Sequence, residues 1–60
     1  MTLYEFNLIC HDSLVVYTMC DDEKVCLFVQ RGPNGKLPEL FEDCEIRETW
    51  LKDGLVAVLI

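Results

Sequence analysis

The stretch "DGLVAVLI", residues 53–60, sets the main constraint on the fold. Six apolar residues follow the turn-forming pair Asp53 and Gly54 without a polar interruption. A strand with one face in water alternates apolar and polar residues, so this run predicts a strand that is covered on both faces. Short helices can cover one face, and in so short a chain a partner molecule is a candidate cover for the other.

The length and composition bound the class of protein. Sixty residues form a single small domain, residues 1–60, that buries only about 60% of the surface exposed by its unfolded chain. Domains of this size often gain stability from disulfides, a metal or a second copy of themselves. There is too little chain to wall a deep pocket, so we expect a protein that is not an enzyme and uses no cofactor.

The charge balance favours some partners over others. Eleven acidic residues against five basic ones give a formal charge of −6, which disfavours direct binding to nucleic acid or to anionic membranes. The N-terminal residues show no signal peptide, and no apolar run approaches the length of a membrane span. We therefore expect a cytoplasmic protein with reduced thiols, whose charge either keeps it soluble or contacts a basic protein.

Two segments predict the first hairpin. Residues 14–20, "LVVYTMC", and residues 25–30, "VCLFVQ", are rich in β-branched and aromatic residues and are separated by the polar turn "DDEK". Both segments are nearly all apolar. The loop "RGPNGKLP", residues 31–38, follows, and its spacing does not match a phosphate-binding loop.

Two further segments favour short helices. In "TLYEFNLI", residues 2–9, Thr2 and Glu5 have the spacing of a capping box, although alternating apolar residues leave a strand as the alternative. In "PELFEDC", residues 38–44, Pro38 suits a first helical turn, and we expect Leu40 and Phe41 to face inward in one short α- or 3₁₀-helix.

The second hairpin is predicted from residues 44–51, "CEIRETWL", and the final apolar run. Alternation places Ile46 and Trp50 on one face. A three-residue turn would pair Trp50 with Val56 and Ile46 with Ile60, gathering the apolar side chains on that face. The expected fold is α+β, with a small four-stranded, mainly antiparallel sheet made of two β-hairpins and one or two short helices.

The candidates for chemistry are cysteines and carboxylates. Four cysteines and the single histidine lack the Cys-x-x-Cys pairs of structural zinc sites, so small apolar core thiols are the simpler interpretation, and a zinc module or a disulfide remains an alternative. The acids form two clusters, which are either solvated charge or a surface that imitates nucleic-acid phosphates. Trp50 is either a core residue or an interface anchor. The candidate partner-binding residues are Asp21, Asp22, Glu23, Glu39, Glu42, Asp43, Glu45 and Trp50.

The end of the chain, with "DCEIRETWLKDGLVAVLI" at residues 43–60, resembles short acidic proteins of bacteriophages and prophages, especially of gut Firmicutes. The resemblance covers mostly residues 40–60, together with the start at residues 2–6. These proteins share an acidic and aromatic strand, a Lys-Asp-Gly turn and a terminal apolar strand. The resemblance implies that the chain is encoded by a phage or mobile element and inhibits a host enzyme or defence protein. It carries over no site residues.

Three functions from different classes follow. The first is an interaction protein that blocks the basic, nucleic-acid-binding groove of a host protein through its acidic face and apolar sheet surface. The second is a small homo-oligomeric assembly module, for which a homodimer is the simplest arrangement. The third is a thiol-metal module built from Cys10, His11, Cys20, Cys26 and Cys44.

Overall fold

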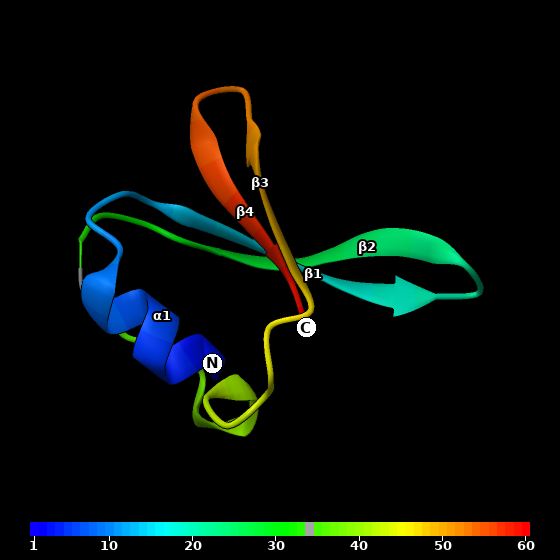
Figure 1. Cartoon of the computed structure of the whole chain (residues 1–60), viewed down its shortest axis with the longest axis horizontal. Helices are drawn as coiled ribbons and strands as arrows, with labels where there is room; N and C mark the ends of the chain where they lie inside the picture. The colour runs from blue at the N-terminus through cyan, green and yellow to red at the C-terminus, as the bar shows by residue number, and fades with distance from the viewer. Residues whose placement is uncertain (34) are drawn as a thin grey trace.

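A computed structural model describes residues 1–33 and 35–60. Two hairpins, one helix and one 3₁₀ turn account for the regular structure, and they are arranged as Figure 1 shows. No helix among these residues has the length and hydropathy needed to cross a membrane. In chain order the elements are α1 (Leu3–Ile9), β1 (Leu14–Cys20), β2 (Glu23–Gln30), η1 (Glu39–Phe41), β3 (Glu48–Lys52) and β4 (Leu55–Leu59).

The four strands form one sheet in the order β2-β1-β4-β3, which confirms the α+β class and corrects the expected strand arrangement. The two hairpins pair antiparallel as predicted, but β1 and β4 pair parallel, so the sheet is mixed and not mainly antiparallel. Burial explains the order of the strands. The two most apolar strands occupy the centre of the sheet, where both of their faces are covered, and the more polar strands take the edges.

One face of the sheet carries the core and is covered by α1 and the long connection between the hairpins. Leu3 from the helix packs with Leu14 and Val16 of β1 and Val58 of β4, and all four are fully buried. Leu37, from the predicted loop, joins this cluster, which the loop's composition did not indicate. Phe28 and Phe41 stack at its margin with ring centroids 5.6 Å apart.

The helix α1 is fixed at its start by a complete capping box, so the alternative of a strand is wrong. The Thr2 hydroxyl oxygen accepts from the Glu5 backbone N–H at 3.2 Å, and the Thr2 N–H donates to Glu5 Oε1 at 2.8 Å. Two further N–H groups of the first turn, those of Leu3 and Tyr4, donate to the carbonyls of Cys44 and Glu42 at 2.9 and 3.0 Å. The start of α1 is therefore docked on the segment after η1.

The second hairpin is one residue tighter than predicted. Asp53 and Gly54 alone form the turn, and Trp50 pairs with Ala57 where the expected register paired it with Val56. Both turn residues have positive φ, 50° and 79°, which is the type I′ pattern favoured in two-residue hairpins because its twist matches the strands. Trp50 therefore lies on the face opposite Val56 and Val58, away from Ile46, which packs against the core.

Three smaller expectations are also corrected. Strand β3 begins at Glu48: before it, Glu45 forms an isolated bridge to Thr2, and the Arg47 N–H donates to the Leu59 carbonyl without extending the ladder. Leu40 does not face inward: its side chain is 83% exposed, and only Phe41 of η1 reaches the core. Pro38 caps η1 instead of entering its first turn.

The loop prediction for residues 31–38 is confirmed for the part of it that the structure describes, and Asn34 lies outside that part. The loop folds around the buried Gln30, whose amide nitrogen donates to the carbonyls of Arg31 and Gly32 at 3.0 and 3.1 Å. The carbonyl of Gly35 accepts from the buried Asn7 amide at 2.8 Å. Two buried amides thus tie the loop to β2 and α1.

The capping box predicts the effect of a substitution at the helix start. Replacing Thr2 with alanine should lower the free energy of unfolding by about 1 kcal/mol, because the Glu5 N–H loses its side-chain acceptor. Urea unfolding followed by circular dichroism measures this change. A Thr2→Ser variant retains the hydroxyl and should stay near the wild-type value, so an equal loss in both variants would contradict the capping explanation.

The same motif predicts a pH dependence. Hydrogen bonds from the Thr2 backbone and side chain hold the pKa of Glu5 below its ordinary value of 4.5. The resulting stabilisation is fully present above that ordinary value and is lost as the pH falls through the lowered pKa. The difference in unfolding free energy between the wild type and Glu5→Gln should therefore shrink on acidification through this window, and a constant difference would show that the carboxylate charge is unimportant.

The two hairpin turns predict opposite effects for adding a glycine and for removing one. Asp21 and Asp22 form the first turn with φ values of 50° and 65°, which cost non-glycine residues energy. Asp22→Gly should raise the unfolding free energy by about 1 kcal/mol, and Gly54→Ala should lower it by about 1 kcal/mol. No atom lies near the position of an added Cβ at Gly54, so a large loss there would reflect backbone conformation alone. Thermal denaturation of both variants tests the pair.

Candidate functional site

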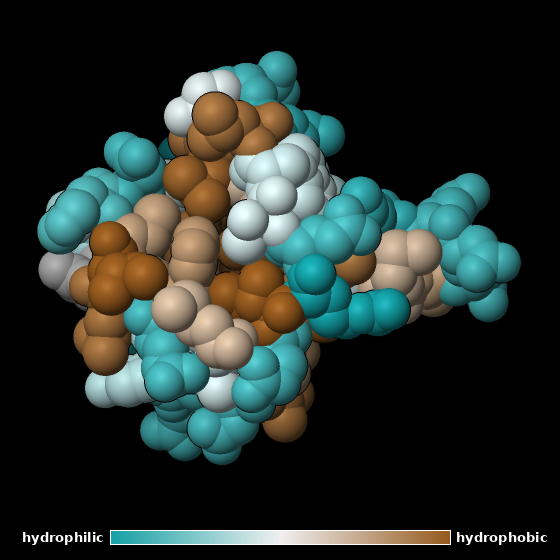
Figure 2. All heavy atoms as spheres, in the orientation of Figure 1, coloured by the Kyte–Doolittle hydropathy of each residue, from teal (hydrophilic) through white to brown (hydrophobic). Residues whose placement is uncertain are grey.

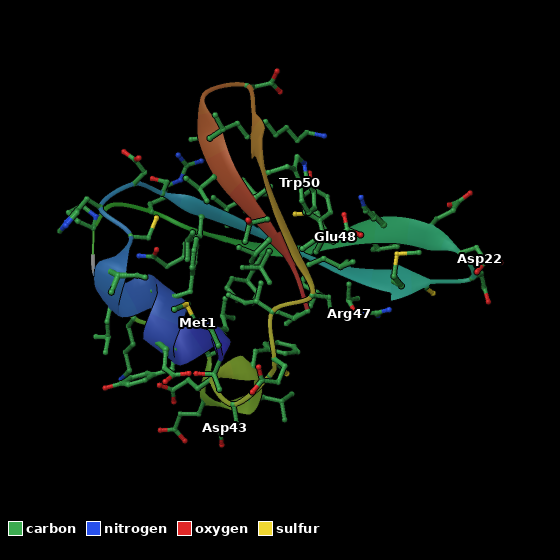
Figure 3. The ribbon with its side chains drawn as sticks, viewed as in Figure 1. Met1, Asp22, Asp43, Arg47, Glu48 and Trp50 are labelled. Atoms are coloured by element: carbon green, nitrogen blue, oxygen red, sulfur yellow. The ribbon has the colours of Figure 1, made fainter. Side chains whose placement is uncertain are left out.

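The two acidic clusters predicted from the sequence lie in separate places. Asp21, Asp22 and Glu23 are at the tip of the β1–β2 hairpin, and the other four surround η1, beside the start of α1. Figure 3 shows Asp22 and Asp43 at different ends of the molecule. The chain therefore presents two acidic surfaces, and a partner with a single small basic site would contact one of them.

The acidic surface around η1 is the more developed of the two. It surrounds a shallow depression lined by Tyr4, Glu39, Glu42 and Asp43. The backbone here is held firmly, because the carbonyl of Glu42 accepts from the Tyr4 N–H and the Cys44 N–H donates to the carbonyl of Phe41. We call these four residues together with Leu40 the η1 patch.

The carboxylates of the η1 patch are available for a partner. Within residues 1–33 and 35–60, no basic group lies within ion-pairing distance of Glu39, Glu42 or Asp43. Glu45 differs, because it accepts from the Met1 amino group at 2.9 Å, a hydrogen bond that raises the pKa of that amine. Leu40 projects into water beside these acids, and Tyr4 is half exposed. Three unpaired carboxylates beside apolar groups suit a basic side chain that carries an aliphatic stem.

Trp50 belongs to neither the core nor the η1 patch. It lies on the face of the sheet opposite α1, where its ring centroid is 5.4 Å from that of Tyr17. Lys24 of β2 reaches this ring, with its Nζ 4.5 Å from the Trp50 centroid and 3.5 Å from Glu48 Oε2. Lys52 stands over Tyr17 at 5.6 Å, and the Tyr17 phenol raises the pKa of its ammonium group.

These contacts explain how the second sheet face is covered. Val15, Ala57 and Leu59 are buried there although no helix lies over them. The side chains of the edge strands β2 and β3 meet across this face through Lys24, Glu48 and Trp50, as Figure 3 shows for the two labelled β3 residues. The sheet thus curls so that its own aromatic and lysine side chains replace part of the cover that the apolar strands require.

The sequence did not indicate Lys24, Tyr17 or Lys52 as members of this cluster. A usable signal was the spacing of Glu48, Trp50 and Lys52, which alternate along one strand and so share a face. The partners from the first hairpin follow only from the parallel contact of β1 with β4, which no local pattern predicted.

Apolar surface remains exposed in several separate areas. Figure 2 shows it at the end of the β3–β4 hairpin and over the central body, and the β1–β2 tip is largely polar. Leu51 is 78% exposed on β3, and Leu8 and Ile9 are exposed on α1. A groove lies between α1 and the loop, lined by Tyr4, Asn7, Leu8, Gly35, Lys36, Leu37 and Glu42.

The cysteines are free and dispersed. Cys20 and Cys26 are exposed and are not paired across the hairpin, since Cys26 lies opposite Tyr17, and only Cys10 packs against the core. The expectation of four core thiols is therefore wrong for the two exposed ones. Outside the masked position 34, no three side chains of the metal-binding types converge on a possible ion site, and the geometry offers nothing to the zinc module.

The contact between Lys24 and Trp50 predicts a measurable coupling. In a double-mutant cycle with Lys24→Met and Trp50→Leu, the two losses of unfolding free energy should be non-additive by about 0.5 kcal/mol, because each substitution removes the same cation–π contact. Additive losses would mean that the two edge strands are not coupled across this face. Lys36→Met, on the loop, provides a control that should add independently of Trp50.

Comparisons with family models, with curated proteins and with solved structures found no match for this chain. The resemblance to small phage proteins therefore stays a prediction. Function has to be inferred from the surfaces themselves, of which the η1 patch and the β3 edge carry the clearest chemistry.

Proposed function

We propose that this chain is a non-enzymatic interaction protein that binds a basic surface of another protein through the η1 patch. One observation carries the proposal: the exposed Leu40 stands among three carboxylates, Glu39, Glu42 and Asp43, that no basic group of the described chain neutralises. Solvent-exposed leucine side chains are ordinary when isolated. A leucine held beside unpaired acids on a hydrogen-bonded turn offers both parts of a contact with lysine or arginine.

The local geometry supports recognition of side chains more than binding of a small molecule. The depression beside Tyr4 is shallow, and its lining mixes a phenol with carboxylates. Carboxylates accept bidentate hydrogen bonds from arginine, and the tyrosine ring can pack on the planar guanidinium group. One or two basic side chains of a partner would fill this site.

The biological role that we propose follows from the charge and the phage resemblance. An acidic chain of 60 residues with a net charge of −6 can occupy a groove that otherwise binds nucleic acid. The target would be a host protein that processes nucleic acid or defends against foreign DNA, and inhibition would occur by steric occlusion. The proposed site is cytoplasmic, in the host cell. Homo-oligomeric assembly remains the second candidate function, supported by the β3 edge described below.

A capture experiment with matched variants tests the proposal. The tagged wild type, a Glu39→Gln/Glu42→Gln/Asp43→Asn variant and an Asp21→Asn/Asp22→Asn/Glu23→Gln variant would be incubated with lysate of a Firmicutes host, and captured proteins identified by mass spectrometry. Each variant removes three charges from an exposed surface, so the fold should persist in both. We expect the wild type to capture a stoichiometric partner that is released by high salt and by added DNA, and we expect only the η1 variant to lose it.

Each alternative outcome has a definite meaning. Loss of the partner only in the hairpin-tip variant would move the site to Asp21, Asp22 and Glu23 and overturn the assignment to η1. Retention of the partner in both variants would show that acidic mimicry is wrong. If added DNA does not release the captured protein, the occlusion mechanism is contradicted, while the contact between the two proteins stands.

A further inference from the structure

The sheet has two edges, and they differ in how open they are to another strand. Strand β2 carries an irregularity in its pairing with β1 between Val16 and Tyr17, and such bulges twist an edge away from a flat partner. Strand β3 is short, contains no proline, and pairs with β4 in unbroken register from Glu48 to Lys52. All but one of its side chains are exposed, and its outer side meets no other strand of the described chain.

The backbone of β3 has a defined set of free hydrogen-bonding groups. The turn at Asp53 and Gly54 makes Lys52 and Leu55 a hydrogen-bonded pair, and such pairs alternate along an antiparallel ladder. The N–H and C=O groups of Thr49 and Leu51 therefore point away from β4. A strand added at this edge would bond to these two residues.

The charges along this edge are self-complementary. In the segment "RETWLKD", residues 47–53, the signs read plus, minus, three neutral residues, plus, minus. Reversing the direction of the segment exchanges every sign. In an antiparallel pair of two copies centred on Trp50, Glu48 therefore lies opposite Lys52 of the second copy, while Arg47 and Asp53 flank the paired strands with opposite charges.

Other registers lose this match. When two copies pair through β3, the residues whose backbone N–H and C=O groups point away from β4 must lie opposite each other. This restricts the centre of symmetry to residues 49, 50 or 51. A centre at Thr49 or at Leu51 leaves Glu48 and Lys52 without opposite charges. Only the centre at Trp50 pairs Thr49 with Leu51 and places both charged residues of β3, Glu48 and Lys52, opposite unlike charges.

The contacts within one chain leave these charges available. Arg47 and Asp53 form no ion pair in the part of the chain that the structure describes. Glu48 meets Lys24 only through Oε2, at 3.5 Å, and its side chain is 57% exposed, so its other oxygen can accept from a second lysine. Figure 3 shows Glu48 and Trp50 in succession along β3, with Arg47 just before the strand begins.

We infer that β3 is a self-recognition edge, at which a second copy of this chain pairs antiparallel about a two-fold axis through Trp50. The pairing joins two sheets into one of eight strands and is isologous, so it closes at a dimer. It buries the exposed Leu51 against Thr49 of the second copy. This inference does not rest on the proposed function, because the η1 patch contributes nothing to it.

A charge exchange between two variants tests the inference. Glu48→Lys and Lys52→Glu each place like charges opposite each other twice in a dimer of identical copies. Mixed together, the two variants place opposite charges at both positions. We expect each variant alone to dimerise with a Kd raised at least about tenfold, and the mixture to form a heterodimer of near wild-type affinity. Sedimentation equilibrium and native mass spectrometry measure these outcomes.

Matched controls carry the same charge changes elsewhere. Glu23→Lys and Lys36→Glu lie on the first hairpin and the loop, so they should leave the Kd of the dimer within about twofold, and their mixture should not favour a heterodimer. Circular dichroism of every variant confirms that the fold is retained. Trp50, the single tryptophan, gives a second readout, since its emission should shift to shorter wavelength as the wild type associates.

Three results would overturn the inference. The first is a wild type that stays monomeric up to about 1 mM. The second is a dimer that the two β3 variants do not weaken, which would place the interface on another surface. The third is a mixture that fails to recover the dimer although both variants fold. Because every variant keeps Glu39, Glu42 and Asp43, failure here leaves capture of a partner by the η1 patch to be judged separately.

Discussion

The parallel contact between β1 and β4 is the constraint on which the rest of the structure depends. It places the two apolar strands side by side at the centre of the sheet, with Leu14 opposite Val56 and Val16 opposite Val58. The edges are then left to β2 and β3, and one face receives α1 and the loop. The unbroken apolar run after Gly54 is thus the mark of a central strand, and a partner is not needed to explain most of its burial.

Local patterns predicted the elements, and long-range contacts escaped them. The capping box of Thr2 and Glu5, the strand from Leu14 to Cys20 and the two hairpins all depend on residues close together in the sequence, and each exists, although the second hairpin has a shifted register. The β1–β4 pairing joins residues about 40 positions apart, so apolar composition alone could not choose between parallel and antiparallel. Leu37 was missed for the same reason, because its burial depends on how the loop crosses the sheet.

The sequence predicted two acidic clusters, and the structure keeps them apart. The acids near η1 do surround one depression, but Asp21, Asp22 and Glu23 belong to a hairpin tip whose direction is set by the twist of the sheet. The register of the second hairpin decided the place of Trp50. A shift of one residue in a strand moves every side chain to the other face. With the two-residue turn at Asp53 and Gly54, Trp50 therefore lies beside Lys24 on the face opposite the core, where the predicted three-residue turn would have placed it in the core.

The η1 patch and the β3 edge are compatible and have different chemistry. Charged residues on an edge strand normally discourage pairing with other proteins, and those of β3 do so except toward a strand that carries the reversed pattern. The one strand certain to carry it is β3 of another copy, so the same charges can exclude foreign strands and select self. A dimer formed there would present two η1 patches on one particle. Binding of the second patch to a partner with repeated basic sites would then be intramolecular, and a weak contact of lysine with carboxylate at each patch would gain avidity without any new interaction.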